Sequence, residues 1–339
     1  MSNNLSDKYF IYQNLIKKKK EIINKIKTET GFVAKKEIFR GELYDKDKVG
    51  SLIYKGKFQE KPAVLKIQLL RPEIDEIDII NTFNRQNKSK KIRLPYLFKG
   101  SRWNKKDGYG YLLMEFVEGK MIYNPPFASE TEIKDFCSFY QEYKTKCLNK
   151  PLFAKSIIEQ SSLVFTTQRI FNWLKIAEAK NNLTEIEIKY TEKFLHLAGE
   201  HLPQIEMQFM HGHLTYADIF KTSGEEYVLM SNLFWSYRPE YYDATFNLWA
   251  GIKSIRDLKI TERQIIKYIN SWISEYKKLP AIKRDADFEK KFNLLMAERC
   301  LGALLVDIQN QNYAKNKKVL TAHLIKIFKN LFDHFTEKL

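Results

Sequence analysis

The hydrophobic pattern of this 339-residue sequence changes once along the chain, and this change restricts the folds open to it. Residues 39–119 carry short alternating or apolar runs between turns, and the runs 51–58 and 62–67 predict a β-hairpin. After residue 127 apolar residues recur mostly at helical spacing, apart from a strand-and-turn stretch at 209–237. Helices are expected at about 129–147, 166–180, 184–200, 261–278, 286–311 and 317–336. The pattern predicts an α+β protein with a small β-rich part followed by a large helical part.

The first 35 residues are expected to form a separate basic helical segment. Apolar residues recur at helical spacing over 1–30, and four consecutive lysines at 17–20 interrupt them. One interpretation is an amphipathic helix that lies on an anionic membrane surface. The other, which we favour because the segment has no Trp, is a helix docked on the domain with a solvated lysine face. The expected domains are residues 1–35, 36–119 and 120–339.

The net charge of +16, from 57 Lys+Arg against 41 Asp+Glu, is the one extreme value of the composition. It is concentrated in two places: residues 84–106 hold nine Lys/Arg and no acid, and residues 1–40 hold ten Lys/Arg and four acids. Such a surface suits a polyanion, such as nucleic acid, a phospholipid surface or a phosphorylated ligand. Because Tyr96, Phe98 and Trp103 are interleaved with the cations of 84–106, a nucleic-acid-binding protein is one hypothesis.

Several classes of protein are disfavoured by composition. The three cysteines form no CxxC pair, which argues against a disulfide framework and a thiolate zinc site. No run approaches the roughly 18 apolar residues of a membrane span, and no secretion signal is visible. The hydrophobic content of 44% suffices for a sizeable core. We therefore expect a folded cytoplasmic protein.

Three separated motifs then occur in an informative order. The first is Ala63-Val-Leu-Lys66 on a strand, followed by a predicted helix from Pro72 to Asn84 that bears Glu73 and Glu76. The second is the apolar strand 110–117, which ends at Glu118-Gly119, and the third is the His-Gly-His segment 210–220 with the strand 227–235 and Tyr242-Asp243-Ala244. This order resembles the aminoglycoside phosphotransferase family, within the protein-kinase-like folds, over roughly residues 36–330. The resemblance implies a bilobal kinase-like fold with a catalytic-loop region at 209–244.

The resemblance also implies a nucleotide site and its residues. Phosphoryl transfer requires a protein to position phosphates, hold Mg²⁺ and orient the nucleophile. Lys66 would contact the phosphates of ATP, and Glu76, or in its place Glu73, would hold that lysine. The backbone of a hinge segment would contact the adenine ring; this segment is Glu115, Phe116 and Val117.

Departures from the family pattern bear on activity. The family has His-Gly-Asp-x-x-x-x-Asn, but here His213 stands at the position of the Asp base and Asp218 at that of the Asn. The metal-binding Asp expected in the next strand is Ser231, with Asn232 beside it. The glycine-rich loop is also absent, since Gly41 and Gly50 are isolated. Any Mg²⁺ would then be held weakly, by Asp218, Asn232 or Ser231.

These departures lead to a main prediction and a rival. Loss of a positioned base typically costs about 10²–10⁴-fold in rate. We therefore expect a pseudokinase that binds a nucleotide or a phosphorylated small molecule with little or no phosphoryl transfer. The rival is an active ATP-dependent small-molecule phosphotransferase in which the imidazole of His213 accepts the proton. His211 and His213 would point to opposite faces of an extended segment, which disfavours a zinc site. His211 is expected to be buried, and Asp243 is expected to anchor backbone.

Overall fold

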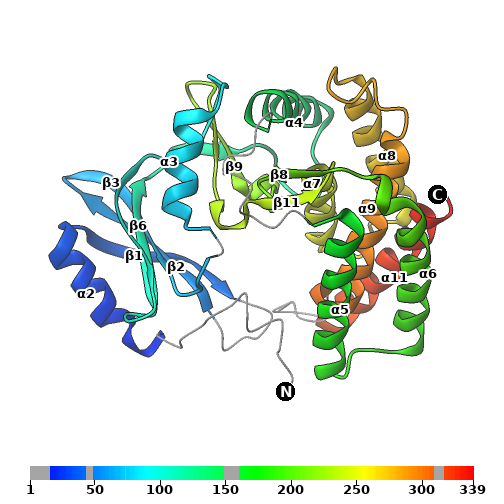
Figure 1. Ribbon diagram of the computed structural model, residues 1–339, viewed down its shortest axis with the longest axis horizontal. Helices are drawn as coiled ribbons and strands as arrows, with labels where there is room; N and C mark the ends of the chain where they lie inside the picture. The colour runs from blue at the N-terminus through cyan, green and yellow to red at the C-terminus, as the bar shows by residue number, and fades with distance from the viewer. Residues whose placement is uncertain (1–15, 43–48, 73, 149–159, 309–316) are drawn as a thin grey trace. The chain divides into compact units, whose positions relative to one another are not determined.

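The computed structural model describes residues 16–42, 49–72, 74–148, 160–308 and 317–339, which fall into two compact units (Figure 1). Unit 1 consists of Met1–Asn87, Arg93–Gly119 and Thr222–Leu233. Unit 2 consists of Lys88–Ile92, Lys120–Lys221 and Phe234–Leu339. Unit 1 is built on a sheet and unit 2 is mainly helical, as the change of hydrophobic pattern predicts.

Unit 1 contains a five-stranded antiparallel sheet with the strand order β1-β2-β3-β6-β5. The predicted hairpin is confirmed: β2 and β3 pair from Ser51 opposite Gln68 to Phe58 opposite Lys61. Its turn uses Gln59 and Glu60, both at positive φ, which a two-residue hairpin turn requires. The strands are β1 (Val33–Glu42), β2 (Val49–Phe58), β3 (Lys61–Gln68), β5 (Leu97–Asn104) and β6 (Tyr109–Glu115).

The two faces of this sheet have different partners because successive side chains of a strand alternate in direction. One face packs against α2 (Lys19–Thr30), where Ile22 and Ile26 join a core with Leu65 and Ile67 of β3. The described part of the N-terminal segment is thus a docked helix, as the favoured interpretation has it, and β1 begins soon after it, at Val33. Residues 1–15 lie outside the described part of the chain. The other face of β3 is adjacent to α3 (Glu76–Gln86), as the contact of Lys66 with Glu76 shows.

Short elements complete unit 1 and its boundaries. The strand predicted at 227–235 covers only residues 227–229, and the later part of the predicted range forms a 3₁₀ turn at 232–234. These elements are η1 (Ile16–Lys18), β4 (Ile92–Arg93), β7 (Gly119–Met121), β10 (Tyr227–Leu229) and η5 (Asn232–Phe234).

Unit 2 contains the long helices that the 3.6-residue period predicts. The helix expected at 129–147 is α-helical only to Glu142, and the one expected at 286–311 only to Gly302; each then continues as five residues of π-helix. A helix that was not predicted, α7 (Tyr242–Lys253), follows the strand-and-turn stretch. Helix α9 is buried along most of its length and packs against α6, α7 and α11. The other helices are α4 (Glu130–Glu142), α5 (Ser162–Ala179), α6 (Glu185–His201), α8 (Glu262–Lys278), α9 (Phe288–Gly302) and α11 (Lys317–Thr336).

The stretch that precedes α7 in unit 2 is a set of short elements. β8 (Met207–Met210) pairs antiparallel with β11 (Ser236–Pro239), and the His-Gly-His segment begins at the end of β8. The 3₁₀ turns are η3 (Leu202–Gln204) and η4 (Tyr216–Asp218), and β9 is Ile219–Thr222. Two π-helical segments, η2 (Tyr143–Cys147) and η6 (Ala303–Asp307), directly follow α4 and α9. Across the described ranges, the helices lack the length and apolar content that crossing a membrane requires.

Candidate functional site

Lys66 and Glu76 meet in unit 1 as a buried ion pair. Lys66 projects from β3 on the face opposite the α2 core, and Glu76 is the first residue of α3, whose N-cap Asp75 accepts a hydrogen bond from the N–H of Ile77. Lys66 Nζ lies 2.6 Å from Glu76 Oε2, and the two residues are only 7% and 2% exposed. The pairing implied by the resemblance is therefore present. Glu73 lies outside the described residues.

A third side chain, which was not identified from the sequence, contacts this pair. Gln68 is two residues after Lys66 on the same face of β3, and its Nε2 donates to Glu76 Oε2 at 2.6 Å. Two donors therefore converge on one carboxylate oxygen and fix the Glu76 side chain. An ammonium group held in this way has a defined position, as a lysine that contacts phosphate oxygens needs. The alternation of residues along β3 was the signal that could have identified Gln68.

The predicted hinge segment starts at the end of β6, where Glu115 is held firmly in unit 1. Its carboxylate accepts hydrogen bonds from the guanidinium of Arg93 and, at 2.8 Å, from the N–H of Tyr96. Arg93 also pairs with Glu226 at 3.2 Å. The Glu115 side chain therefore has a structural role in holding the start of the segment in place.

Two of the three backbone N–H groups of the hinge segment already donate hydrogen bonds within unit 1. The N–H of Glu115 donates to the carbonyl of Tyr96 at 3.0 Å, and that of Phe116 donates to Pro62 at 3.4 Å. Among the described residues, the N–H of Val117 has no such backbone partner. Of the three predicted hinge residues, Val117 thus offers the N–H group best suited to an adenine ring.

Ser231 and Asn232, the predicted weak metal ligands, lie beyond β10 in unit 1. Asn232 is buried, and its Nδ2 donates to the carbonyl of Leu229 at 2.9 Å. Ser231 has a φ of 57°, an uncommon conformation for a residue other than glycine. Both side chains are neutral, so this strand end brings no carboxylate of its own to a cation.

The His-Gly-His segment of unit 2 is anchored through its backbone. The N–H of Gly212 donates to Asp243 Oδ1 at 2.9 Å, which confirms the prediction that Asp243 anchors backbone. Tyr143 links the same parts, because its hydroxyl donates to Asp243 Oδ2 at 2.7 Å and accepts from the N–H of His211 at 2.8 Å. Burial raises the pKa of Asp243. His211 is fully buried, as expected.

Glycine is required between the two histidines. Gly212 has a φ of 73°, and a Cβ there would lie 2.6 Å from the carbonyl oxygen of Phe234. Both the conformation and the close contact exclude a larger side chain without a shift of backbone. The turn places His211 in the interior and leaves the side chain of His213 37% exposed.

His213 and Asp218 form a hydrogen-bonded pair. His213 Nδ1 lies 3.1 Å from Asp218 Oδ2, and the same oxygen accepts from the N–H and the hydroxyl of Thr215, at 3.1 and 2.5 Å. The imidazole also stacks on Phe234, with 4.6 Å between ring centroids, and contacts Phe246 at 4.9 Å. The predicted base position and the predicted metal ligand are thus bonded to each other. The Thr-x-x-Asp spacing of a capping box was the sequence signal for Thr215.

This donor set does not fit a resident Mg²⁺ ion. Mg²⁺ needs octahedral oxygen ligation, usually with one or two carboxylates. Of the three predicted ligands only Asp218 is a carboxylate, and its Oδ2 already accepts three hydrogen bonds; Ser231 and Asn232 are neutral. Within the part of the chain that the structure describes, His, Cys, Asp and Glu side chains form no group of three or more suited to a metal.

The basic segment 84–106 covers the end of α3, β4 and β5; its residues belong to unit 1 except for Lys88–Ile92, which belong to unit 2. Tyr96 and Phe98 are exposed, at 55% and 38%, but Phe98 stacks on Phe58 with 5.4 Å between ring centroids. Two of its cations are engaged with acids: Arg93 with Glu115, and Arg102 with Asp78 at 2.5 Å. Part of the charge of this segment therefore serves the packing of unit 1.

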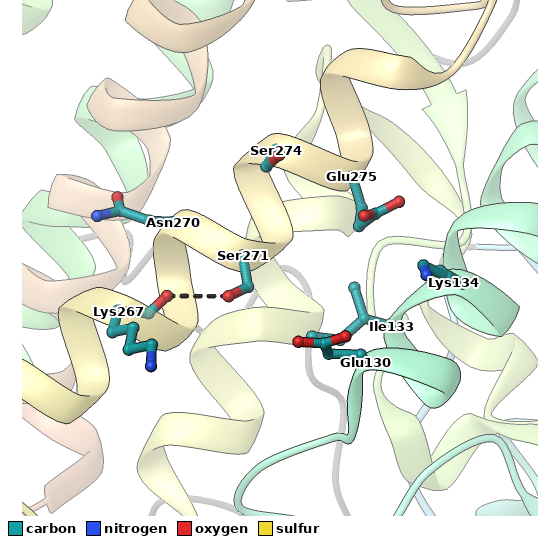
Figure 2. Close-up of a pocket in the computed structure, with 8 residues that line it drawn as sticks. All are labelled: Glu130, Ile133, Lys134, Lys267, Asn270, Ser271, Ser274 and Glu275. Atoms are coloured by element: carbon teal, nitrogen blue, oxygen red, sulfur yellow. Dashed lines mark hydrogen bonds between the residues drawn. The ribbon is translucent and has the colours of Figure 1, made fainter.

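A cavity of about 370 Å³ lies elsewhere in unit 2, between α4 and α8 (Figure 2). Charged side chains line it, including Glu130 and Lys134 of α4 and Lys267 and Glu275 of α8. None of the predicted site residues lines this cavity, and the catalytic roles considered above do not involve it.

Comparison with known proteins identifies the fold. No protein-family model matches the sequence, and no curated protein sequence matches it significantly. Among solved structures, it is similar to a thermostable mutant of the aminoglycoside phosphotransferase APH(4)-Ia in complex with ADP and hygromycin B. The TM-score is 0.59 and the identity 10%, over 90% of this chain and 97% of that chain.

Two further structures agree. A Ralstonia eutropha JMP134 protein assigned as an aminoglycoside phosphotransferase gives a TM-score of 0.59 at 9% identity, over 94% of this chain and 98% of that one. A microcompartment-associated aminopropanol kinase gives 0.54 at 10% identity, over 93% and 98%. The chain therefore has the aminoglycoside phosphotransferase-like form of the protein-kinase-like fold, as the sequence predicted.

Proposed function

We propose that this kinase-like chain is a pseudokinase, which binds a nucleotide through unit 1 and has little or no phosphoryl-transfer activity. The fold supports nucleotide binding, because the similar APH(4)-Ia has been solved with ADP and with AMP-PNP. The pair Lys66–Glu76 supports it from this chain's own residues, since it presents a buried, fixed ammonium group. Val117 supplies a backbone N–H for the base.

The proposal of little or no phosphoryl transfer rests on the hydrogen bonds of Asp218. A phosphotransferase site with separate residues for the base and the metal can perform both functions at once. Here three donors already bind one oxygen of Asp218, the carboxylate of the His213–Asp218 pair. His213 has no negative charge with which to hold a cation. The predicted base and metal ligand therefore form one structural unit.

An active phosphotransferase is the second candidate, and a specific feature of the same pair favours it. A carboxylate bonded to Nδ1 of a histidine fixes the ring and leaves Nε2 as the proton acceptor, as in catalytic triads. The half-exposed imidazole of His213 satisfies this arrangement. In this candidate His213 Nε2 accepts the proton of a substrate hydroxyl, and Asp218 positions His213.

Nucleotide binding is tested by calorimetric titration of the full chain with ATP, with Mg²⁺ and with EDTA. We expect binding in both conditions, and its loss in Lys66→Met, which removes the charge but keeps most of the volume. Lys57→Met, on the neighbouring strand β2 and paired with Glu60 at the surface, is the matched control. Absence of binding at millimolar ATP, or equal binding by Lys66→Met, would exclude this nucleotide site.

Phosphoryl transfer is tested by phosphate release from ATP and by transfer to mixtures of small hydroxylated or amino compounds. The pseudokinase proposal expects release no faster than in the His213→Ala variant. A rate in the wild type at least about 10²-fold above that of His213→Ala, the usual contribution of a general base, would instead establish the second candidate.

A further inference from the structure

Three arginines from distant parts of the sequence meet on one aromatic ring in unit 2. Arg169 comes from α5, Arg238 from β11 and Arg299 from α9. Their guanidinium carbons lie 4.9, 5.3 and 4.5 Å from the centre of the Tyr242 ring. Cation–π contacts explain how the charges are tolerated in the interior, but they supply no counter-charge.

The available counter-charge is shared by two of the three. Glu298 is fully buried and forms ion pairs with Arg169 and, at 3.4 Å, with Arg299. Arg169 also donates to the hydroxyl of Tyr242 at 2.7 Å. Burial raises the pKa of Glu298, although both its coupling to Arg169 and their hydrogen bond oppose this. One carboxylate thus forms ion pairs with two guanidinium groups, and it attracts the charge of Arg238 without contacting it.

Arg238 is the member without an acidic partner. Over the described ranges it forms no ion pair and no side-chain hydrogen bond, and its Nε is buried without an acceptor. Its guanidinium lies 4.7 Å from the ring centre of Phe165, and burial together with the nearby Arg169 lowers its pKa. Asp243 is also nearby, but its two oxygens accept from Gly212 and Tyr143. A buried cationic donor with no acceptor is costly, and so requires an explanation.

Arg238 lies next to the His-Gly-His segment. Its Nε lies 3.1 Å from the point where a Cβ on Gly212 would be, so it contacts the turn between the two histidines. Phe246 connects the cluster to the pair described above, because its ring is 5.4 Å from the Arg299 guanidinium and 4.9 Å from the His213 ring. The three arginines therefore lie directly behind the candidate catalytic segment, within one unit.

We propose that Arg238, supported by Arg169 and Arg299, binds the oxyanion of a small molecule, either a phosphate or a carboxylate group. A guanidinium matches both groups with two parallel hydrogen bonds, and the anion would supply the acceptor that Nε lacks. The ligand of this part of unit 2 is then anionic, opposite in charge to an amino sugar. This site does not depend on nucleotide binding in unit 1.

The test is thermal unfolding and calorimetric titration of the full chain with inorganic phosphate and, separately, with acetate, at an ionic strength matched with sodium chloride. We expect one or both anions to raise the melting temperature of the wild type, and the anion with the larger effect identifies the chemical source. In Arg238→Gln the affinity should fall by about tenfold or more, the size expected for a lost charge-assisted hydrogen bond. Arg284→Gln removes an exposed arginine of the same unit and should leave the affinity unchanged.

Each variant is compared with its own anion-free melting temperature, so a change of basal stability does not enter the result. If Arg238→Gln does not fold, Arg238→Lys serves instead, because it keeps the charge but loses the planar fork, and weaker binding is again expected. No stabilisation of the wild type by either anion beyond that of chloride, or equal stabilisation of the Arg238 variant, would overturn the proposal. ATP titration of Arg238→Gln separates the two sites, since binding through Lys66 should persist in it.

Discussion

Replacing Asp218 with asparagine perturbs the His213–Asp218 pair with a minimal change of shape. In the wild type, Asp218 Oδ2 accepts from His213 Nδ1 and from two groups of Thr215. A hydrogen bond to a charged group contributes about 1.5–3 kcal/mol, against about 0.5–1.5 kcal/mol for a neutral one. Loss of the charge should therefore cost about 1 kcal/mol for each of the three bonds. We expect the free energy of unfolding to fall by about 2–4 kcal/mol.

The same variant should change the proton position on the imidazole. Because an ionised carboxylate only accepts hydrogen bonds, Nδ1 of His213 must carry the proton in the wild type. The amide of asparagine can donate to Nδ1, which would move the proton to Nε2. Nitrogen-15 chemical shifts of the histidine ring distinguish the two tautomers, and urea unfolding measures the loss of stability.

Asp257→Asn is the matched control, since Asp257 is exposed and its carboxylate accepts a hydrogen bond from the backbone N–H of Lys259. It should leave both the His213 tautomer and the stability nearly unchanged. A wild-type His213 protonated at Nε2, or a tautomer that is the same in Asp218→Asn, would refute the argument that Asp218 positions His213.

Two further substitutions test the packing around the site. Gly212→Ala should destabilise the protein by about 1–3 kcal/mol in urea unfolding, because the added Cβ would lie 2.6 Å from the Phe234 carbonyl oxygen and the residue has a φ of 73°. Gly199→Ala is the control: its Cβ would meet no atom within 4 Å, so it should be neutral or stabilising. A Gly212→Ala protein of wild-type stability would contradict the clash. Burial raises the pKa of Asp285, but the hydrogen bonds from Lys291, from Tyr241 and from the N–H of Asp287, together with the charge of Lys291, outweigh it and hold that pKa below its ordinary value. The stabilisation is therefore present above the ordinary carboxyl pKa and is lost as the pH falls through the lowered one. Lys291→Met should therefore lower stability by about 1–3 kcal/mol at pH 7 and much less below about pH 3; an equal loss at both pH values would count against the pairing.

The fold could be predicted from the sequence wherever a segment has one polar and one apolar side. The helices α8 and α6 have this form, and their bounds were expected within a residue or two. Helix α7 was missed because ten of its twelve residues are buried, so it shows no polar face. The strand β5 was missed because four of its eight residues are exposed without strict alternation, and it lies within the basic run 84–106.

Some contacts of the candidate site were likewise expected from the sequence, and others were not. The pair Lys66–Glu76 was expected from the family resemblance, which pairs the lysine of this strand with an acid on the helix that follows. The bond between His213 and Asp218 could not be expected, since it depends on the turn at Gly212 and on the donors of Thr215. The contact of Arg169 with Tyr242, 73 positions apart, is set by tertiary packing, for which the sequence carries no local signal.

The exchange of residues at 213 and 218 has a consequence beyond the loss of one carboxylate. In the family pattern, the base and the metal ligand are independent, so each can act while the other is engaged. Here the acid at 218 already positions the histidine at 213, and a cation at Asp218 would compete with His213 for the same oxygen. A protonated imidazole would in addition repel that cation. His213 and a cation would therefore compete for Asp218 Oδ2, and this competition is why the pseudokinase interpretation is the stronger of the two.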